Sequence, residues 1–336
     1  MLEHGGRLGR AVRQYGIARE RWLDLSTGVS PFAYPVPALP PSVWQRLPED
    51  DDGLLDAARG YYGTHHLLPV AGSQAAIAAL PRLRGPSRVV VVEPAYAEHA
   101  HAWRQAGHDV VTLPFEALLA RAHEFDVIVV IRPNNPTGEC PDRETLLALH
   151  ARLTDRKPVA PGPAPHRPWL VVDEAFIDVY PEESLCSAMR DGLIVLRSVG
   201  KFFGLAGARA GFVAAWPGLL DDLSEVLGPW TLTGPTRYVV ARALADTAWQ
   251  ASAREWLRVA SARLASLLAE RGLQPSGGCE FFQYCEHPDA GALRHALAQR
   301  AILVRHFDSP QALRFGLPAD KAAFAVLGRA LSEVVA

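Results

Sequence analysis

SVGKFFGLAGARAGF, from Ser198 to Phe212, is the stretch of this chain that indicates its fold most directly. Lys201 is one of only three lysines in 336 residues, and Ser198 and Arg209 lie three residues before it and eight after it. An amine can hold an aldehyde as a Schiff base, while a hydroxyl and a guanidinium can bind a phosphate. The glycines keep the backbone between them compact. The stretch therefore predicts a lysine loop for a phosphorylated aldehyde cofactor.

Short apolar runs alternate with helical patterns over the first two thirds of the chain. Continuous apolar runs indicate strands covered on both faces, so this alternation predicts an α/β fold with a mostly parallel sheet between helices. Ligands of such sheets bind beyond the carboxyl ends of the strands. The predicted strands are Leu67–Val70, Arg88–Glu93, Asp109–Leu113, Asp126–Ile131, Trp169–Asp173, Leu193–Ser198 and Gly211–Ala215, and the clearest helices are Ser73–Arg82, Ala97–Ala106 and Arg143–Leu153.

The last third of the chain differs in character and predicts a smaller α+β domain. Helical patterns run from Ala241 to Arg271 and are followed by a break at Gly277-Gly278. Further segments follow at Phe281–Cys285, Ile302–Arg305 and Ala312–Gly316, before a closing helix. We expect an N-terminal arm at 1–40 that is associated with the small domain and the active site, a large cofactor-binding domain at 41–235 and a small domain at 236–336. The proline-rich stretch 158–168 is predicted as a surface loop.

Composition narrows the class of protein. A net charge of -2 argues against a nucleic-acid binder that neutralises phosphates. The first residues lack the apolar core of a signal peptide, and no apolar run reaches the roughly 18 residues of a membrane span. We therefore expect a cytoplasmic protein without a nucleic-acid or membrane partner. No metal is expected, because the spacing of the cysteines matches no metal site and fits ordinary buried thiols: Cys140, Cys186, Cys279 and Cys285.

Two predicted strands end in polar residues suited to a flat, charged ring. Asn134 and Asn135, the only asparagines in the chain, follow the strand that ends at Ile131. An asparagine amide can donate to a phenolate oxygen, although a plain Asn-Pro turn would explain the same residues. Asp173 ends another strand, where a buried carboxylate needs a partner such as a protonated pyridine nitrogen. Its alternative role is a helix N-cap.

Three further residues fit the same site. Gly72 and Ser73 follow a short strand and open a helix, where free N–H groups and the helix dipole suit a phosphate. The same pair also forms an ordinary N-cap. Tyr96 follows the strand Arg88–Glu93 and could stack on a ring, or simply belong to the core.

In this order the motifs resemble the fold-type-I pyridoxal phosphate enzymes of the aspartate aminotransferase superfamily, in the branch of the histidinol-phosphate aminotransferases. The resemblance implies a large domain with a seven-stranded sheet, a homodimer, and pyridoxal 5'-phosphate as cofactor. Lys201 would carry the cofactor and move protons, Asp173 would pair with the pyridine nitrogen, Asn135 would contact the ring hydroxyl and Tyr96 would stack on the ring. The implied phosphate ligands are Gly72, Ser73, Ser198 and Arg209.

The chain departs from this pattern at two positions. Relatives usually carry a tyrosine that reaches the ring oxygen where this chain has Phe176, which cannot form a hydrogen bond. Relatives also often carry Arg-Tyr-Pro where this chain has Arg46-Leu47-Pro48, so it lacks the tyrosine that reaches the partner subunit's cofactor phosphate. Both departures weaken the case for simple transamination.

The N-terminal segment is similar to that of the threonine-phosphate decarboxylases of cobalamin biosynthesis. The similarity rests on His4-Gly5-Gly6, on LDLSTGVSP at 23–31 and on YPVP at 34–37. It implies L-threonine O-3-phosphate as substrate, and (R)-1-amino-2-propanol O-2-phosphate and carbon dioxide as products. Without the similarity, a flexible glycine-rich tail would explain the first residues. The implied substrate ligands are His4, Thr27, Gly28, Asn135, Arg305 and Arg314, with Ser26 and the region of Arg46 as further candidates.

The resemblance also implies that Arg314 holds the substrate carboxylate with its planar fork; the alternative is a solvated strand arginine. Two other functions remain open at this point. A histidinol-phosphate-type aminotransferase would use 2-oxoglutarate and glutamate, and a non-catalytic regulator would bind the cofactor without turnover. Release of carbon dioxide without an amino acceptor separates the decarboxylase from both.

Overall fold

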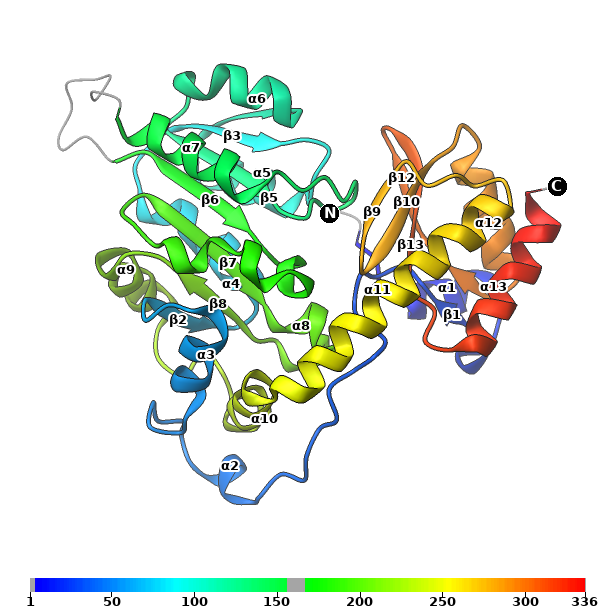
Figure 1. The fold of residues 1–336 in the computed structure, drawn as a ribbon, viewed down its shortest axis with the longest axis horizontal. Helices are drawn as coiled ribbons and strands as arrows, with labels where there is room; N and C mark the ends of the chain where they lie inside the picture. Colours follow the sequence, from blue (N-terminus) through cyan, green and yellow to red (C-terminus); the bar gives the residue numbers. More distant parts are fainter. Residues whose placement is uncertain (1–3, 156–166, 336) are drawn as a thin grey trace. The chain divides into compact units, whose positions relative to one another are not determined.

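Figure 1 shows the fold of the chain in a computed structural model, which describes residues 4–155 and 167–335. These residues form two compact units. The larger unit consists of Tyr34–Asn135 and Cys140–Trp249, and the smaller unit contains the residues up to Ala33, Pro136–Glu139 and the residues from Gln250 onward. Most of the predicted surface loop at 158–168 lies outside the described residues.

The division of the chain differs from the predicted boundaries at 40/41 and 235/236. The residues up to 33 belong to the smaller unit, whereas the larger unit extends to Trp249. It does so because helix α10 (Gly234–Ala245) packs against α3 (Leu54–Tyr62). Arg237 of α10 also donates to Asp52, with Nη2 2.9 Å from Oδ1.

The larger unit is built on a seven-stranded sheet in the order β2-β8-β7-β6-β5-β3-β4. Neighbours from β7 to β4 are parallel, and β8 is antiparallel to both β7 and β2. The prediction of a mostly parallel seven-stranded sheet is therefore confirmed. The strands are β2 (Leu67–Val70), β3 (Arg88–Val92), β4 (Asp109–Leu113), β5 (Val127–Ile131), β6 (Trp169–Asp173), β7 (Leu193–Ser198) and β8 (Gly211–Ala214).

Helices cover the sheet and complete an apolar core. Helices α4 (Ser73–Ala79), α5 (Glu98–Gln105) and α9 (Pro217–Leu227) contribute to one buried cluster with side chains from the strands. Helices α6 (Phe115–Arg121) and α7 (Arg143–Thr154) contact β3 and β6. Each fully buried valine or leucine contributes about 1.5–3 kcal/mol, which explains why the valine-rich strands end up between helices.

The smaller unit contains a four-stranded antiparallel sheet in the order β12-β13-β10-β9 and a short parallel pair, β1 with β11. Its strands are β1 (Leu23–Asp24), β9 (Gly277–Cys279), β10 (Phe282–Glu286), β11 (Ile302–Leu303), β12 (Arg305–Asp308) and β13 (Gln311–Gly316). Its helices are α1 (Leu8–Tyr15), α12 (Ala290–Gln299), α13 (Lys321–Val334) and most of α11 (Thr247–Glu270). None of the helices in the described residues is long and apolar enough to cross a bilayer.

Two local expectations for this unit are wrong. The pair Gly277-Gly278 is not a break but begins strand β9, where Gly277 pairs with Tyr284. The single strand expected at Ile302–Arg305 is two strands, because β11 pairs with β1 from the N-terminal segment and β12 pairs with β13. Of these pairings, that of β1 with β11 joins residues far apart in the chain, whereas β12 and β13 are neighbours in sequence.

Candidate active site

A cavity of about 140 Å³ lies in the larger unit, and residues at the carboxyl ends of β5, β6 and β7 line it. The structure brings together here all eight residues that the sequence proposed for the cofactor. Its lining also includes Gln74, Ile131, Ala175 and Phe176, which were not proposed as cofactor ligands. The eight are Gly72, Ser73, Tyr96, Asn135, Asp173, Ser198, Lys201 and Arg209.

One end of the cavity is suited to a phosphate. Gly72 has a positive φ of 74°, and a Cβ there would meet Nη2 of Arg209 at 2.7 Å. A Cβ on Gly211 would likewise lie 2.7 Å from the backbone nitrogen of Ser73. Only glycine allows these approaches. The hydroxyls of Ser73 and Ser198 and the Arg209 guanidinium thus line a cradle of donors at the start of α4.

Asp173 lies at the end of β6 and is almost completely buried. Its Oδ2 is 2.9 Å from Nε2 of His99, and its Oδ1 accepts from the backbone nitrogen of Ala175 at 3.1 Å. The bond to Ala175 is a local turn contact, and no α-helix starts there, so the N-cap alternative does not describe this residue. A buried carboxylate with such partners is suited to a pyridinium nitrogen.

His99 was missed by the reasoning from sequence. It lies in α5, three residues after Tyr96, and is 1% exposed. The only signal that could have revealed it is its close spacing to Tyr96, which lies in the loop just before α5. That spacing could have placed His99 beside Tyr96 at the same edge of the sheet.

Lys201 lies in the short helix α8 (Val199–Phe202), directly after β7. Its Nζ is 5.6 Å from the centroid of the Phe176 ring. The ring is buried and therefore forms an apolar wall of the cavity near the amine. The Lys201 amine therefore lies beside an apolar surface of the cavity.

The two asparagines have separate places. Asn134 is buried and donates through Nδ2 to the carbonyl oxygen of Pro94 at 2.7 Å. It joins the loops that follow β3 and β5, which is a structural role. Asn135 lines the cavity, as a contact with a ring oxygen would require.

Tyr96 lines the cavity and also packs partly against the apolar core. Its hydroxyl donates to Oε1 of Gln74 at 3.1 Å. Burial raises the pKa of Tyr96 to about 12, and the negative charges of Glu98 and Asp173 add to this rise. The phenol is therefore neutral at physiological pH and presents an uncharged face.

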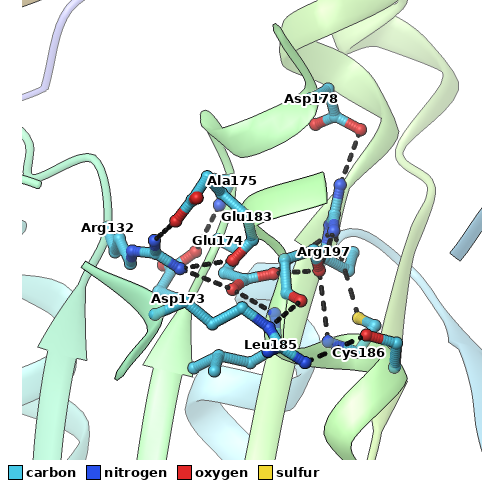
Figure 2. Close-up of polar contacts among 12 residues, drawn as sticks. Arg132, Asp173, Glu174, Ala175, Asp178, Glu183, Leu185, Cys186 and Arg197 are labelled. Atoms are coloured by element: carbon cyan, nitrogen blue, oxygen red, sulfur yellow. Dashed lines mark hydrogen bonds and ion pairs between the residues drawn. The ribbon is translucent and has the colours of Figure 1, made fainter. Parts of the chain in front are cut away.

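A charge cluster lies beside the ends of the same strands (Figure 2). We use this name for Arg132, Glu174, Asp178 and Arg197, which are all buried. Arg197 Nη1 is 3.2 Å from Glu174 Oε2, and Arg197 Nη2 is 2.8 Å from Asp178 Oδ1. Arg132 Nη1 is 3.6 Å from Glu174 Oε1. None of these residues was proposed from the sequence.

The smaller unit contains a second, strongly basic cavity of about 50 Å³. His4 and Arg305, both proposed as substrate ligands, line it together with Ser26. Thr27 and Gly28 follow Ser26 in the chain but are not part of the lining. No acidic side chain is found among its described lining residues, and the other basic ones are Arg7, Arg10, Arg294 and His306.

Arg314 is also in the smaller unit, on β13, where it pairs across the sheet with Arg305 of β12. It is 6% exposed, so it is not a solvated strand residue, and its Nη2 donates to the carbonyl oxygen of Ser26 at 3.0 Å. Burial lowers the pKa of Arg314 to about 10, and the positive charge of Arg305 contributes to this. Two neighbouring arginines of which one is buried provide a good site for an anion.

The donors of the larger cavity fit pyridoxal phosphate group by group. Its lining includes Lys201, Asp173 and Asn135, whose amine, carboxylate and amide would match the aldehyde, the pyridine nitrogen and the ring oxygen. The cradle formed at Gly72 and Arg209 fits the phosphate.

Comparisons with known proteins agree with the set of residues found in the larger cavity. The sequence profile of the family described as aminotransferase class I and II matches residues 56–323. Threonine-phosphate decarboxylase of Pseudomonas aeruginosa is 52% identical over 98% of this chain and 97% of its own length. Threonine-phosphate decarboxylase of a Sinorhizobium species is 39% identical over 99% and 98%.

A similar fold is found in the crystal structure of histidinol-phosphate aminotransferase from Sinorhizobium meliloti in complex with pyridoxal-5'-phosphate. The TM-score is 0.84 at 22% identity, with 99% of this chain and 95% of that chain covered. At this level of identity the similarity concerns the fold.

Proposed function

Because this chain belongs to the class I and II aminotransferase family and, within it, to the threonine-phosphate decarboxylases, we propose that it decarboxylates L-threonine O-3-phosphate. The products are (R)-1-amino-2-propanol O-2-phosphate and carbon dioxide, and the reaction serves cobalamin biosynthesis. The proposed reaction type rests on one observation, the 52% identity to a threonine-phosphate decarboxylase over almost the whole of both chains.

Pyridoxal phosphate, when bound, supplies an electron sink for the pair of electrons that the departing carboxylate leaves behind. The Asp173 carboxylate would hold the ring nitrogen in its protonated form, which this chemistry requires. The Lys201 amine would be the group that returns a proton to the α-carbon. The apolar wall at Phe176 limits water beside Lys201.

Recognition of the substrate is the proposed task of the smaller unit. Its basic cavity, with His4 and Arg305, is suited to the substrate phosphate. Thr27 and Gly28 lie in the same segment, and Arg314 would orient the carboxylate without holding it so tightly that it cannot leave. These contacts would fix the orientation of the substrate, and this orientation would decide which bond of its α-carbon breaks.

We also propose that the chain acts as a homodimer. Several large apolar side chains of the larger unit are exposed, including Trp44 at 66%, Leu47 at 64% and Trp230 at 58%. Exposed apolar groups of this size are typical of interaction surfaces. The four cysteines are free thiols, which supports a reducing compartment such as the cytoplasm.

The test is incubation of the cofactor-loaded protein with L-threonine O-3-phosphate in the absence of any keto acid. We expect equal amounts of carbon dioxide and aminopropanol phosphate. The rival is a histidinol-phosphate aminotransferase, which would release no carbon dioxide. It would instead convert histidinol phosphate only when 2-oxoglutarate is present, and that result would refute the proposed reaction.

A further inference from the structure

The charge cluster is joined through the backbone to the cavity residues. Arg132 directly follows β5, Glu174 directly follows Asp173 at the end of β6, and Arg197 directly precedes Ser198 on β7. These three strands are neighbours in the centre of the sheet. Adjacent residues of a strand point to opposite faces of the sheet. The cluster side chains and the cavity side chains therefore come from neighbouring positions of the same strand ends and lie on opposite faces.

Backbone hydrogen bonds extend the sheet as far as the cluster. The backbone nitrogen of Arg132 donates to the carbonyl oxygen of Asp173 at 2.8 Å, and that of Glu174 donates to Leu196 at 2.9 Å. The side chains then add a second set of ties between the same three strands. A shift of Arg132, Glu174 or Arg197 therefore moves a strand end that carries a cavity residue.

The loop after β6 closes the cluster. Ser184 Oγ donates to Glu174 Oε2 at 2.6 Å and accepts from Arg197 Nη1 at 2.7 Å, so one hydroxyl joins both charges. At the edge of the cluster, Arg132 Nη2 is 2.7 Å from Glu183 Oε2. Figure 2 shows that these side chains converge on Glu174 and Arg197.

The same contacts keep the arginines bound away from Asp173. Arg132 is held by Glu174 and Glu183, and Arg197 by Glu174 and Asp178. Asp173 accepts instead from His99 and from a backbone amide. In these contacts the arginines and Asp173 have separate partners, and the charge of each arginine is already matched by a cluster carboxylate, as a buried charge requires.

We propose that the charge cluster is a positioning device for the cofactor. It fixes the ends of β6 and β7, so that Asp173 and Ser198 stay at the separation that the ring nitrogen and the phosphate require, and it leaves the charge of Asp173 for the ring. The cluster residues are positioning residues and do not touch the cofactor. The inference rests on the proposed function only in the identity of the cofactor.

The experiment measures the affinity of the apoprotein for pyridoxal phosphate by absorbance titration, and the Tm of the same apoprotein. Arg197→Lys keeps the charge but loses the fork that contacts Glu174 and Asp178. We expect its Kd for pyridoxal phosphate to rise about tenfold or more, as is common when a supporting contact of a site is lost.

A matched control is Arg84→Lys. Arg84 is also a buried arginine of the larger unit, but it donates to Ser87 Oγ at 3.0 Å and lies over Trp169 at the opposite, amino-terminal end of β6. Arg84→Lys is expected to lower Tm by a similar amount while its Kd stays within about twofold of wild type. Equal losses of Tm with an unchanged Kd in both variants would overturn the inference.

A milder pair of variants decides the question if Arg197→Lys does not fold. Ser184→Ala removes only the shared hydroxyl, whereas Ser184→Thr keeps it. Weaker cofactor binding in Ser184→Ala and recovery in Ser184→Thr support the positioning role, and the same Kd in both variants contradicts it. No substrate enters this titration. A wild-type protein that binds the cofactor but releases no carbon dioxide would therefore count against the proposed reaction alone.

Discussion

His99 Nε2 lies 2.9 Å from Asp173 Oδ2, and both side chains are almost completely buried. The contact ties α5 to the carboxyl end of β6. It also fixes one oxygen of the carboxylate that we place against the pyridine nitrogen. His99 is therefore a positioning residue for Asp173, and its importance can be tested separately from that of the carboxylate.

Replacing His99 is expected to slow the reaction. His99→Phe keeps a buried ring but leaves Asp173 Oδ2 without this partner, so we expect kcat to fall about tenfold or more. His99→Gln retains a donor and should lose less. The measurement is kcat against pH for both variants. If kcat against pH for His99→Phe matched wild type in shape and height, this would contradict the positioning role of His99.

Lys201→Ala should abolish the chemistry while leaving the fold intact. We expect decarboxylation to fall by roughly 10³-fold or more, within the range of a lost proton-transfer group. Borohydride reduction of the wild-type holoenzyme should fix the cofactor on the peptide that contains Lys201. Lys321 on α13 serves as an internal control. Cofactor fixed on the peptide that contains Lys321 instead of Lys201 would contradict the assignment of Lys201 as the cofactor lysine.

Tyr96 should make stability depend on alkaline pH. Its pKa is raised to about 12 in the folded protein by burial, against about 10 in an unfolded chain. The folded state thus holds this proton more tightly. The stabilisation of the folded state that results from this pKa difference is fully present below about pH 10 and is lost as the pH rises to about 12. Tm measured across this range should fall less steeply in Tyr96→Phe than in wild type. Parallel curves of Tm against pH for the two proteins would show that ionisation of the Tyr96 phenol does not affect stability.

Phe176→Tyr tests the departure from the usual pattern. The ring is buried in the cavity wall, so the larger residue should fit only if its hydroxyl reaches the space of the cofactor ring. There it could donate to the ring oxygen, and we expect pyridoxal phosphate to bind roughly three- to tenfold more tightly. Titration of the apoprotein measures this. Weaker binding would mean that the cavity lacks room for the hydroxyl.

Arg305→Met should impair recognition of the substrate but not of the cofactor. Arg305 lines the basic cavity of the smaller unit, and losing a charged donor to phosphate should raise KM for L-threonine O-3-phosphate about tenfold or more. The Kd for pyridoxal phosphate should not change. Arg300→Met is the matched control, because Arg300 pairs with Glu333 through a contact of 2.8 Å outside that cavity. An equal rise of KM in both variants would refute a specific role.

Much of the larger unit could be predicted because its signals are local. Apolar runs such as DVIVVI and WLVVD are bounded by polar residues, so strands β5 and β6 begin and end close to the predicted residues. The polar residues that follow them then meet at one edge of the sheet by topology alone. This is why Asp173, Asn135 and Lys201 could be proposed together before the structure was known.

The remainder depends on contacts between distant segments. Arg197 lies inside an apolar strand, and its partners Glu174 and Asp178 come from another loop, so no local pattern reveals the charge cluster. The contact between His99 and Asp173 joins residues 74 positions apart. In the smaller unit, β1 pairs with β11 across almost the whole chain. Such pairings are decided by packing and not by propensity.

The close approach of Gly211 to the backbone nitrogen of Ser73 limits which residues can replace this glycine during evolution. A methyl group added at Gly211 would enter the space of the loop that we assign to the phosphate. Gly72 has a positive φ that strains any other residue, and a Cβ there would push against the Arg209 guanidinium. A substitution at either position is therefore expected to disturb the phosphate site, so descendants of this gene should retain glycine at both.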